Sequence, residues 1–240
     1  MNVTCVEATR DPIGVALMCA ENMSGHMMTH RSQLEIVYSR AEQQERFLSL
    51  GRTRLAGPLE FIHFFFQVEG VPRWFTHQLV RTRIASYSQS SMRFVNHASE
   101  GLPVLRPNLT SEQEEVWDSA IQHVESAYTQ LVCDGVSFED ARGLLPNAIL
   151  TNIGIDMSLK TLIGVAETRL CFQAQTLWQE FMSKVKVAII SFYAYSPAGE
   201  AYLINDLLVP ACQRAGKCTF KSMYDRKCPK DPALKGECQS

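Results

Sequence analysis

The spacing of apolar residues predicts a chain in which short strands alternate with longer helices. Alternation of polar and apolar side chains predicts a strand over residues 2–9, and the aromatic-rich run Phe61–Val68 predicts a second. Asn147–Asp156 predicts a third strand. Helices are predicted from Pro12 to residue 23, over 33–50, from Pro72 into the arginine-rich residues after Leu79, over 111–135, 138–145, 158–166 and 198–212, and from about Phe172 to Tyr195.

Side chains that can accept hydrogen bonds from free backbone N–H groups mark two of these helix starts. Thr110 with Gln113, or Ser111 with Glu114, has the spacing of a capping box at the start of the long helix that follows. Ser158 is predicted to cap the helix that begins after it. These signals place the helix starts more firmly than apolar spacing does alone.

The chain shows no internal repeat, no low-complexity tract and no stretch with the composition of a linker. Residues 1–216 are therefore expected to form a single α/β domain, of the α+β kind. Residues 217–240 are rich in Lys, Pro, Gly and Cys, and they predict an irregular tail that contains cysteines.

Bulk composition excludes several classes of function. The chain has 240 residues and a formal net charge of −2, so no overall field favours a nucleic acid polymer or a membrane surface. It contains no run of about 18 apolar residues that predicts a membrane span. The N-terminus lacks the basic and apolar regions of a secretory signal, which favours a cytoplasmic protein.

Eight cysteines are present, and their spacing contains no Cys-x-x-Cys pair. Four stand in apolar surroundings and are predicted to be small buried side chains: Cys5, Cys19, Cys133 and Cys171. Four more gather near the C-terminus: Cys212, Cys218, Cys228 and Cys238. We expect reduced thiols and no metal site.

The densest chemistry lies in Gln78–Phe94, which reads QLVRTRIASYSQSSMRF and contains three arginines and four serines. Guanidinium groups bind phosphate oxygens in pairs, and serine hydroxyls supply further donors. The segment therefore suits a phosphate group. A solvated surface loop explains the same composition equally well.

The order of residues in this segment resembles the signature of flavin-dependent thymidylate synthases. That signature is Arg-His-Arg, seven residues and Ser, with a Gln three residues before the first Arg. The matching residues are Gln78, Arg81, Arg83, Ser91 and, two residues further on, Arg93, while Thr82 stands in place of the His. The family's Asn-Glu before the Ser is replaced by Ser and Gln.

Two later segments extend the resemblance to about residues 55–220. Ala141–Pro146 resembles the family's Ala-Arg-x-x-Leu-Pro element, in which the Arg reaches the nucleotide. Met157–Gln179 resembles a third region, where Arg169 matches and Glu167 replaces an Asn. Gln179 replaces an arginine that holds the uracil ring in the family; a plain surface glutamine is the alternative. Upstream, Glu60-Phe61 stands where the family has Glu-His.

The resemblance implies a fold and a role for each position. The fold implied is a central, mostly antiparallel sheet flanked by long helices. The residues implied at the flavin are Arg81, Thr82, Arg83, Ile84, Phe65, Gln89, Glu167, Arg169 and Gln173. Those implied at the nucleotide are Gln78, Arg81, Gln89, Ser90, Ser91, Met92, Arg93, Arg142 and Gln179. Those implied in catalysis are Gln179, Arg81 and Ser91, without a metal ion.

The activity implied is transfer of a one-carbon unit from methylenetetrahydrofolate to C5 of dUMP, giving dTMP, with FAD and NADPH as cofactors. The family also implies a homotetramer with shared active sites. Two alternatives stay open, because Gln carries a donor and an acceptor where Arg only donates. One is C5 methylation or hydroxymethylation of UMP or dCMP. The other is a nucleotide-binding homologue with weakened catalysis.

Overall fold

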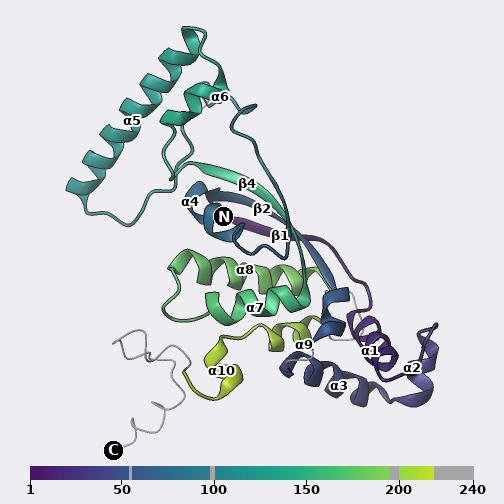
Figure 1. Ribbon diagram of the computed structural model, residues 1–240. Helices are drawn as coiled ribbons and strands as arrows, with labels where there is room; N and C mark the ends of the chain where they lie inside the picture. Colours follow the sequence, from purple (N-terminus) through teal and green to yellow (C-terminus); the bar gives the residue numbers. More distant parts are fainter. Residues whose placement is uncertain (54–55, 98–100, 195–199, 219–240) are drawn as a thin grey trace, which may run out of the picture. The chain divides into compact units, whose positions relative to one another are not determined.

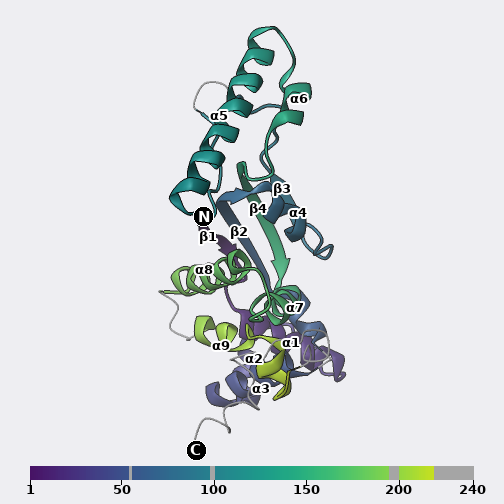
Figure 2. The ribbon, with the colours of Figure 1, turned by 90° about the vertical axis from the view of Figure 1, so that its left-hand side faces the viewer.

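Four strands form one antiparallel sheet in the order β1-β2-β4-β3. The computed structural model describes residues 1–53, 56–97, 101–194 and 200–218. The strands are β1 (Asn2–Ala8), β2 (His63–Pro72), β3 (Ser86–Gln89) and β4 (Leu150–Ser158). Figure 1 labels β1, β2 and β4, and Figure 2 labels β3 as well. The predicted combination of an antiparallel sheet with long helices is confirmed.

Helices make up most of the remaining described chain. The α-helices are α1 (Pro12–Met23), α2 (Ser32–Val37), α3 (Arg40–Arg52), α4 (Arg73–Leu79), α5 (Ser111–Cys133), α6 (Phe138–Ala141), α7 (Leu159–Arg169), α8 (Thr176–Phe192), α9 (Glu200–Leu207) and α10 (Ala211–Ala215). Two 3-10 helices are η1 (Gly57–Phe61) and η2 (Arg142–Leu144). No helix in the described ranges combines the length and the apolar character that crossing a membrane requires.

The described residues divide into two compact units. Unit 1 comprises Met1–Asn2, Val68–Arg83 and Tyr87–Gly154, and unit 2 comprises the other described residues. The chain passes between the units within each of the four strands and once more after Arg83. The single domain over 1–216 stays a prediction, and the predicted tail lies outside the described residues apart from 217–218.

Unit 1 has a small core beside one long helix. Val71, Phe75, Leu79 and Ile149 are fully buried where α4 packs against the chain leading into β4. Helix α5 contacts α6 and η2, and Tyr128 is the only one of its described side chains that is buried (Figure 1). The rest of α5 is exposed or half-buried within unit 1, so its apolar residues are only partly covered.

Unit 2 contains the larger core. Phe64 and Phe66 of β2 stack with ring centroids 5.9 Å apart, and both rings are buried. Helix α8 buries Trp178, Phe181 and four further side chains, and it contacts α7 and α9. Helices α1, α2, α3 and α9 gather in the same unit, as Figure 2 shows. This apolar packing supports the ends of α7 and α8, where several predicted site residues lie.

Several predicted elements are confirmed with their caps. Helix α5 begins after Thr110, whose hydroxyl accepts from the Gln113 N–H, which selects one of the two predicted capping boxes. Ser158 caps α7 as predicted, accepting from the Thr161 N–H at 3.3 Å. The strand predicted at the N-terminus forms as β1.

Other predicted elements are wrong in their extent. The single helix predicted over 33–50 is two helices, because Tyr38 is extended and Ser39 begins a new capping box with Glu42. The strand predicted over 61–68 begins at His63, after η1, and continues to Pro72. Strand β3 was not predicted, because Ser86–Gln89 is too polar to look like a core strand.

Candidate functional site

The arginine-rich segment starts from a firmly packed α4. The N–H of Arg73 donates to the Ile149 carbonyl at 3.0 Å, and the N–H of Trp74 donates to the Asn147 carbonyl at 3.1 Å. The predicted helix start at Pro72 is confirmed, since Pro72 is the residue before α4. These bonds fix the start of α4 beside the chain that follows η2.

Thr76 ties β3 to α4 through a buried hydroxyl. Its Oγ1 donates to the Arg73 carbonyl at 3.0 Å and accepts from Nε2 of Gln89 at 2.9 Å. Thr76 is fully buried, so losing either bond would leave a polar group without water. Gln89, predicted at both flavin and nucleotide, therefore uses its amide nitrogen to hold the scaffold.

The turn after α4 presents the first two arginines to solvent. Tyr87 Oη lies 2.9 Å from the carbonyls of both Leu79 and Thr82, and burial raises the pKa of Tyr87. Arg81 and Arg83 are both exposed on this turn. Among the described residues neither guanidinium has a hydrogen-bond or ion-pair partner, so their donors are available.

Ser90 and Ser91 shape the chain that leads to the third arginine. The Ser90 N–H donates to the Asn152 carbonyl at 3.0 Å, which continues the pairing of β3 with β4. The Ser91 hydroxyl accepts from the Arg93 N–H at 3.3 Å. The Ser91 carbonyl accepts from Phe94 N–H at 3.1 Å, so the chain turns tightly at Arg93.

Glu139 brings Arg93 and Arg142 together. Nη2 of Arg93 donates to the Glu139 carboxylate at 2.9 Å, and both side chains are about half exposed. Nε of Arg142 donates to the Glu139 backbone carbonyl at 3.0 Å. Glu139 therefore holds one guanidinium through its carboxylate and the other through its backbone carbonyl, and two positive charges stand here against one negative charge. No described contact links Arg81 or Arg83 to this pair.

Arg73 is a third cation at this place, and sequence reasoning missed it. Burial lowers the pKa of Arg73, and the positive charge of Arg142 lowers it further. That coupling agrees with the backbone bond from Arg73 to Ile149, a few residues after Arg142. The sequence signal was only an arginine after Pro72, which looks like any surface arginine. We call Arg73, Arg93 and Arg142 the cation cluster.

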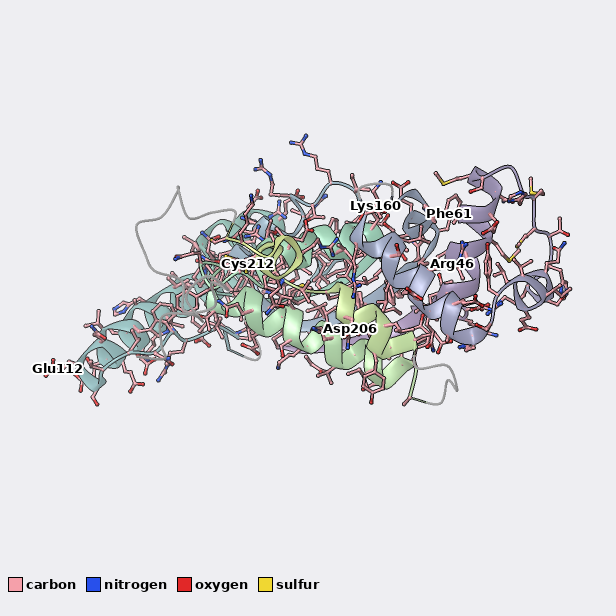
Figure 3. All side chains as sticks on the ribbon, turned by 90° about the horizontal axis from the view of Figure 1, so that it is seen from below. Arg46, Phe61, Glu112, Lys160, Asp206 and Cys212 are labelled. Atoms are coloured by element: carbon pink, nitrogen blue, oxygen red, sulfur yellow. The ribbon has the colours of Figure 1, made fainter. Side chains whose placement is uncertain are left out.

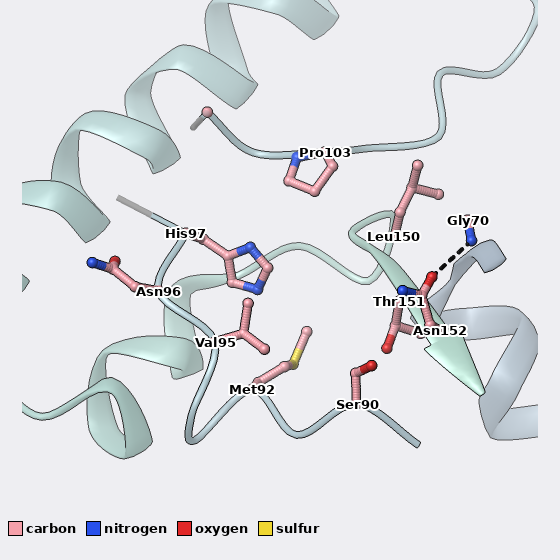
Figure 4. A pocket seen from close by; sticks show the side chains of 11 residues that line it. Gly70, Ser90, Met92, Val95, Asn96, His97, Pro103, Leu150, Thr151 and Asn152 are labelled. Carbon is pink, nitrogen blue, oxygen red and sulfur yellow. Dashed lines mark hydrogen bonds between the residues drawn. The ribbon is translucent and has the colours of Figure 1, made fainter. Parts of the chain in front are cut away.

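A cavity of about 400 Å³ lies beside Ser90 in unit 1 (Figure 4). Its polar lining groups include Ser90, Thr151 and Asn152, and Asn152 Oδ1 accepts from the Gly70 N–H at 3.0 Å. Burial lowers the pKa of His97, so its imidazole is neutral near pH 7. The lining residues are Gly70, Ser90, Met92, Val95, Asn96, His97, Gly101, Pro103, Leu150, Thr151 and Asn152. None of these described lining residues carries a formal charge at neutral pH, and together they suit an uncharged polar ring.

Arg169 in unit 2 lies over the indole of Trp178, with 4.2 Å from its guanidinium carbon to the ring centroid. Burial lowers the pKa of Arg169. Glu167, predicted at the flavin, is instead paired with Arg214, whose Nε lies 2.9 Å from its carboxylate. Gln173 and Phe65 are half-buried, and the side chain of Ile84 is 81% exposed.

Gln179 holds the turn between α7 and α8. Its Nε2 lies 3.1 Å from the Ala174 carbonyl and 3.4 Å from those of Cys171 and Phe172. An amide nitrogen has two hydrogens, so these acceptors occupy its donors. Only the side-chain oxygen is left for the base-reading role that the sequence predicts.

The side chains of Glu60 and Phe61 are both exposed, unlike those of residues in the core. The Glu60 carboxylate accepts a hydrogen bond from Lys160, and Phe61 is 63% exposed (Figure 3). An exposed aromatic ring offers a stacking surface rather than a proton donor. This is a chemical difference from the histidine implied at position 61.

The cysteines differ in their burial. Cys5 is buried as predicted, and burial raises the pKa of its thiol to about 12. Cys133 is exposed at the end of α5, so its predicted burial is wrong. Cys19 and Cys171 are half-buried, while Cys228 and Cys238 lie outside the described residues. Within the described ranges no group of three His, Cys, Asp or Glu side chains could hold a metal.

A family model described as thymidylate synthase complementing protein matches residues 5–189. A flavin-dependent thymidylate synthase of Geobacter sulfurreducens is 42% identical over 134 residues, which cover 55% of this chain and 56% of the relative. One of Pyrococcus furiosus is 32% identical over 184 residues, covering 75% and 74%. The chain spans about half the length of several curated relatives that it matches.

Solved structures show a similar fold. The flavin-dependent thymidylate synthase ThyX of Helicobacter pylori, complexed with FAD and dUMP, gives a TM-score of 0.66 at 21% identity, covering 86% of this chain and 99% of that one. The UMP/dUMP methylase PolB of Streptomyces cacaoi, bound with 5-Br dUMP, gives 0.63 at 16% identity, covering 87% and 96%. At such low identities the likeness concerns the fold.

Proposed function

Because this chain belongs to the thymidylate synthase complementing protein family, we propose that it is an FAD-dependent enzyme acting on a pyrimidine nucleotide. It transfers a one-carbon unit from methylenetetrahydrofolate to C5 of the base, with dUMP as the first candidate substrate and dTMP as its product. The observation that carries the proposal is the cation cluster, held beside the segment that contains Ser91.

The cation cluster supports the phosphate-binding part of the proposal. Three guanidiniums gather here, and only that of Arg93 is paired with a carboxylate, so their remaining donors are available for charge-assisted bonds to an anionic ligand. A dianionic phosphate would complete this charge balance. In this proposal Arg93 and Arg142 bind the phosphate oxygens. Gln78 and Ser91 contact the nucleotide, and Arg73 adds a third positive charge near Arg142.

The neutral cavity supports a pyrimidine as the base. Its hydroxyl and amide groups can both donate and accept, as the edge of a pyrimidine requires, and its apolar walls can cover the faces of a flat ring. Ser90 and Met92, both expected at the nucleotide, line it. Among the described residues that line the cavity, none is a charged side chain that would select a charged ring.

The residues proposed for the flavin fit an anionic, flat cofactor. Arg81 and Arg83 are exposed and have no partner within the described residues, so they can bind phosphate oxygens of FAD. Arg169 offers a third set of donors, near Gln173 in the chain. Thr82, Ile84 and Phe65 complete the proposed lining. Bound FAD, reduced by NADPH, would supply the hydride that the one-carbon transfer needs.

A homotetramer with shared sites is part of the same proposal. Helix α5 leaves Val116 72% exposed and buries only Tyr128 among its described side chains, so a second copy could cover its apolar residues. We place the enzyme in the cytoplasm. Light scattering during gel filtration measures the assembly, and a chain that stays monomeric at all concentrations would contradict shared sites.

Product analysis tests the reaction directly. The protein is incubated with FAD, NADPH and methylenetetrahydrofolate together with dUMP, UMP or dCMP, and the nucleotides are analysed by mass spectrometry. The proposal expects a C5-methylated product from dUMP and dependence on each added component. A protein that takes up no FAD on titration, or that leaves all three nucleotides unchanged, would contradict it.

A nucleotide-binding protein with weakened catalysis is the second candidate, and two observations favour it. Phe61 presents an exposed ring that cannot move a proton, and the Gln179 amide is already engaged with its own turn. Such a protein would bind dUMP through the cation cluster yet consume no NADPH. Measuring NADPH oxidation in the presence of nucleotide and folate separates the two candidates.

A further inference from the structure

We propose that Trp178 is a positioning residue for Arg169: the buried indole holds the guanidinium flat, so that its N–H donors face a ligand oxygen. This inference rests on the proposed function, in which Arg169 contacts the bound flavin. It assigns a task to a tryptophan that would otherwise be taken for an ordinary core residue.

Trp178 is a rigid support. Its side chain is fully buried, and its ring meets Phe181 edge to face with centroids 5.8 Å apart. The guanidinium carbon of Arg169 lies 4.2 Å from the indole centroid, well within the range of a cation–π contact. A fixed ring beneath a planar cation restricts the rotation of that cation without using its hydrogen-bond donors.

The donors of Arg169 are uncommitted. Among the described residues, Arg169 has no hydrogen bond and no ion pair, and its contact with Trp178 uses only the face of the guanidinium. Glu167, the nearest carboxylate along the helix, is paired with Arg214. The five N–H groups of this half-buried arginine are therefore available to a ligand that supplies acceptors.

The turn between the two residues is locked. The Gln179 amide donates to carbonyls of residues 171–174, which lie between Arg169 at the end of α7 and Trp178 in the first turns of α8. The lock sets the spacing between Arg169 and Trp178 before any ligand arrives. The ligand chemistry that fits is a carbonyl or anionic oxygen on a flat ring system, such as that of an oxidised or reduced flavin.

The test compares two substitutions at position 178 with a matched core control. Trp178→Phe keeps an aromatic face, and Trp178→Leu removes it. Phe181→Leu removes the neighbouring ring that packs edge to face on Trp178 and leaves the indole in place. FAD affinity is measured by fluorescence titration, and stability by thermal melting. We expect Trp178→Leu to weaken FAD binding about 3- to 30-fold and Trp178→Phe to recover most of it. Phe181→Leu should lower the melting temperature with little change in FAD affinity.

A double-mutant cycle separates positioning from general packing. In an Arg169→Gln background, Trp178→Leu should cause no further loss of FAD affinity, because the cation that the ring supports is absent. Equal losses in both backgrounds, or equal FAD affinity in Phe181→Leu and Trp178→Leu, would overturn the proposal.

A ligand-free measurement keeps this inference distinct from the proposed function. The ring current of Trp178 should shift the Arg169 side-chain NMR signals, and the shift should disappear in Trp178→Leu. If the wild type shows this shift but takes up no FAD, the proposed function fails while the stacking stands. If the shift is absent, the positioning role fails whatever the flavin does.

Discussion

Arg142 and Arg169 stand in different units, and the chain holds each guanidinium by a different device. In unit 1, Arg142 donates to the backbone carbonyl of Glu139, and the Glu139 carboxylate forms an ion pair with Arg93. In unit 2, the guanidinium of Arg169 rests on the face of Trp178 and makes no described hydrogen bond. Hydrogen-bond acceptors therefore hold Arg142, whereas an aromatic ring holds Arg169.

The difference predicts how each arginine responds to a ligand. Acceptors in the cation cluster compete with an incoming phosphate, so binding there must displace or share existing contacts. The indole beneath Arg169 does not compete with a ligand for the N–H groups of the guanidinium. All of these donors are therefore available and already oriented. We therefore expect the cation cluster to set affinity through charge, and Arg169 to set orientation.

Removing a charge from the cation cluster gives the largest expected effect. Arg142→Ala should weaken dUMP binding about 10- to 100-fold, since hydrogen bonds to charged groups contribute about 1.5–3 kcal/mol. Deoxyuridine, which has no phosphate, should bind both proteins equally. Isothermal titration with both ligands measures the difference.

Arg106→Ala is the matched control, because Arg106 is an arginine of the same unit paired with Asp118 outside the cation cluster. It should leave both affinities unchanged. If Arg142→Ala lowered the affinity for deoxyuridine as much as the affinity for dUMP, Arg142 would not be a phosphate ligand. The proposed contrast between Arg142 and Arg169 would then be wrong.

Gln179→Met is expected to give the second-largest effect, and it tests unit 2, where Arg169 lies. The substitution keeps the volume and removes the donors to the 171–174 turn, so stability should fall by about 1 kcal/mol. Urea unfolding measures this loss, and the ratio of dUMP to dCMP affinity should stay the same. A changed ratio with unchanged stability would instead favour the base-reading role predicted from the sequence.

Gln179 also illustrates a limit of sequence reasoning. Its acceptors are three carbonyls of a folded turn, and nothing in the letters around position 179 distinguishes such a residue from a ligand-binding one. Arg73 failed to attract attention for the same reason, since its relation to Arg142 exists only through tertiary backbone bonds. The polar strand β3 forms because β4 supplies its partners.

Features with a local physical cause, such as helix caps, were predicted more accurately than those that depend on tertiary contacts. The caps at Thr110 and Ser158 act within four residues, so their hydrogen bonds follow from the sequence alone. The break between α2 and α3 had the same kind of signal in Ser39 and Glu42, but the apolar spacing across 33–50 masked it. Arg93 and Arg142 were expected to share a ligand, and the structure brings them together at Glu139.

Relieving the competition within the cation cluster should have a smaller and opposite effect. Glu139→Gln removes the single carboxylate that faces Arg93, so dUMP should bind up to about fivefold tighter, in line with the modest strength of exposed ion pairs. The gain should shrink as salt is added. Glu112→Gln, at the exposed start of α5, is the control for a general change in net charge. Weaker dUMP binding in Glu139→Gln would mean that Glu139 orients the arginines rather than competing for them.

The smallest expected effect concerns the neutral cavity beside the cation cluster. Burial lowers the pKa of His97 below its ordinary value near 6.5, so the unfolded chain takes up a proton at His97 before the folded chain does. As pH falls through this window the unfolded state binds more protons, and stability is lost until the folded pKa is reached. When the pH is lowered from about 7.5 to about 5.5, an interval that includes the ordinary pKa of histidine, the melting temperature of His97→Gln should therefore fall less than that of the wild type. His123→Gln, on the exposed face of α5, should behave as the wild type. If His97→Gln lost as much as the wild type, the imidazole would already carry its proton in the fold, and the cavity would no longer contrast with the charged cluster next to it.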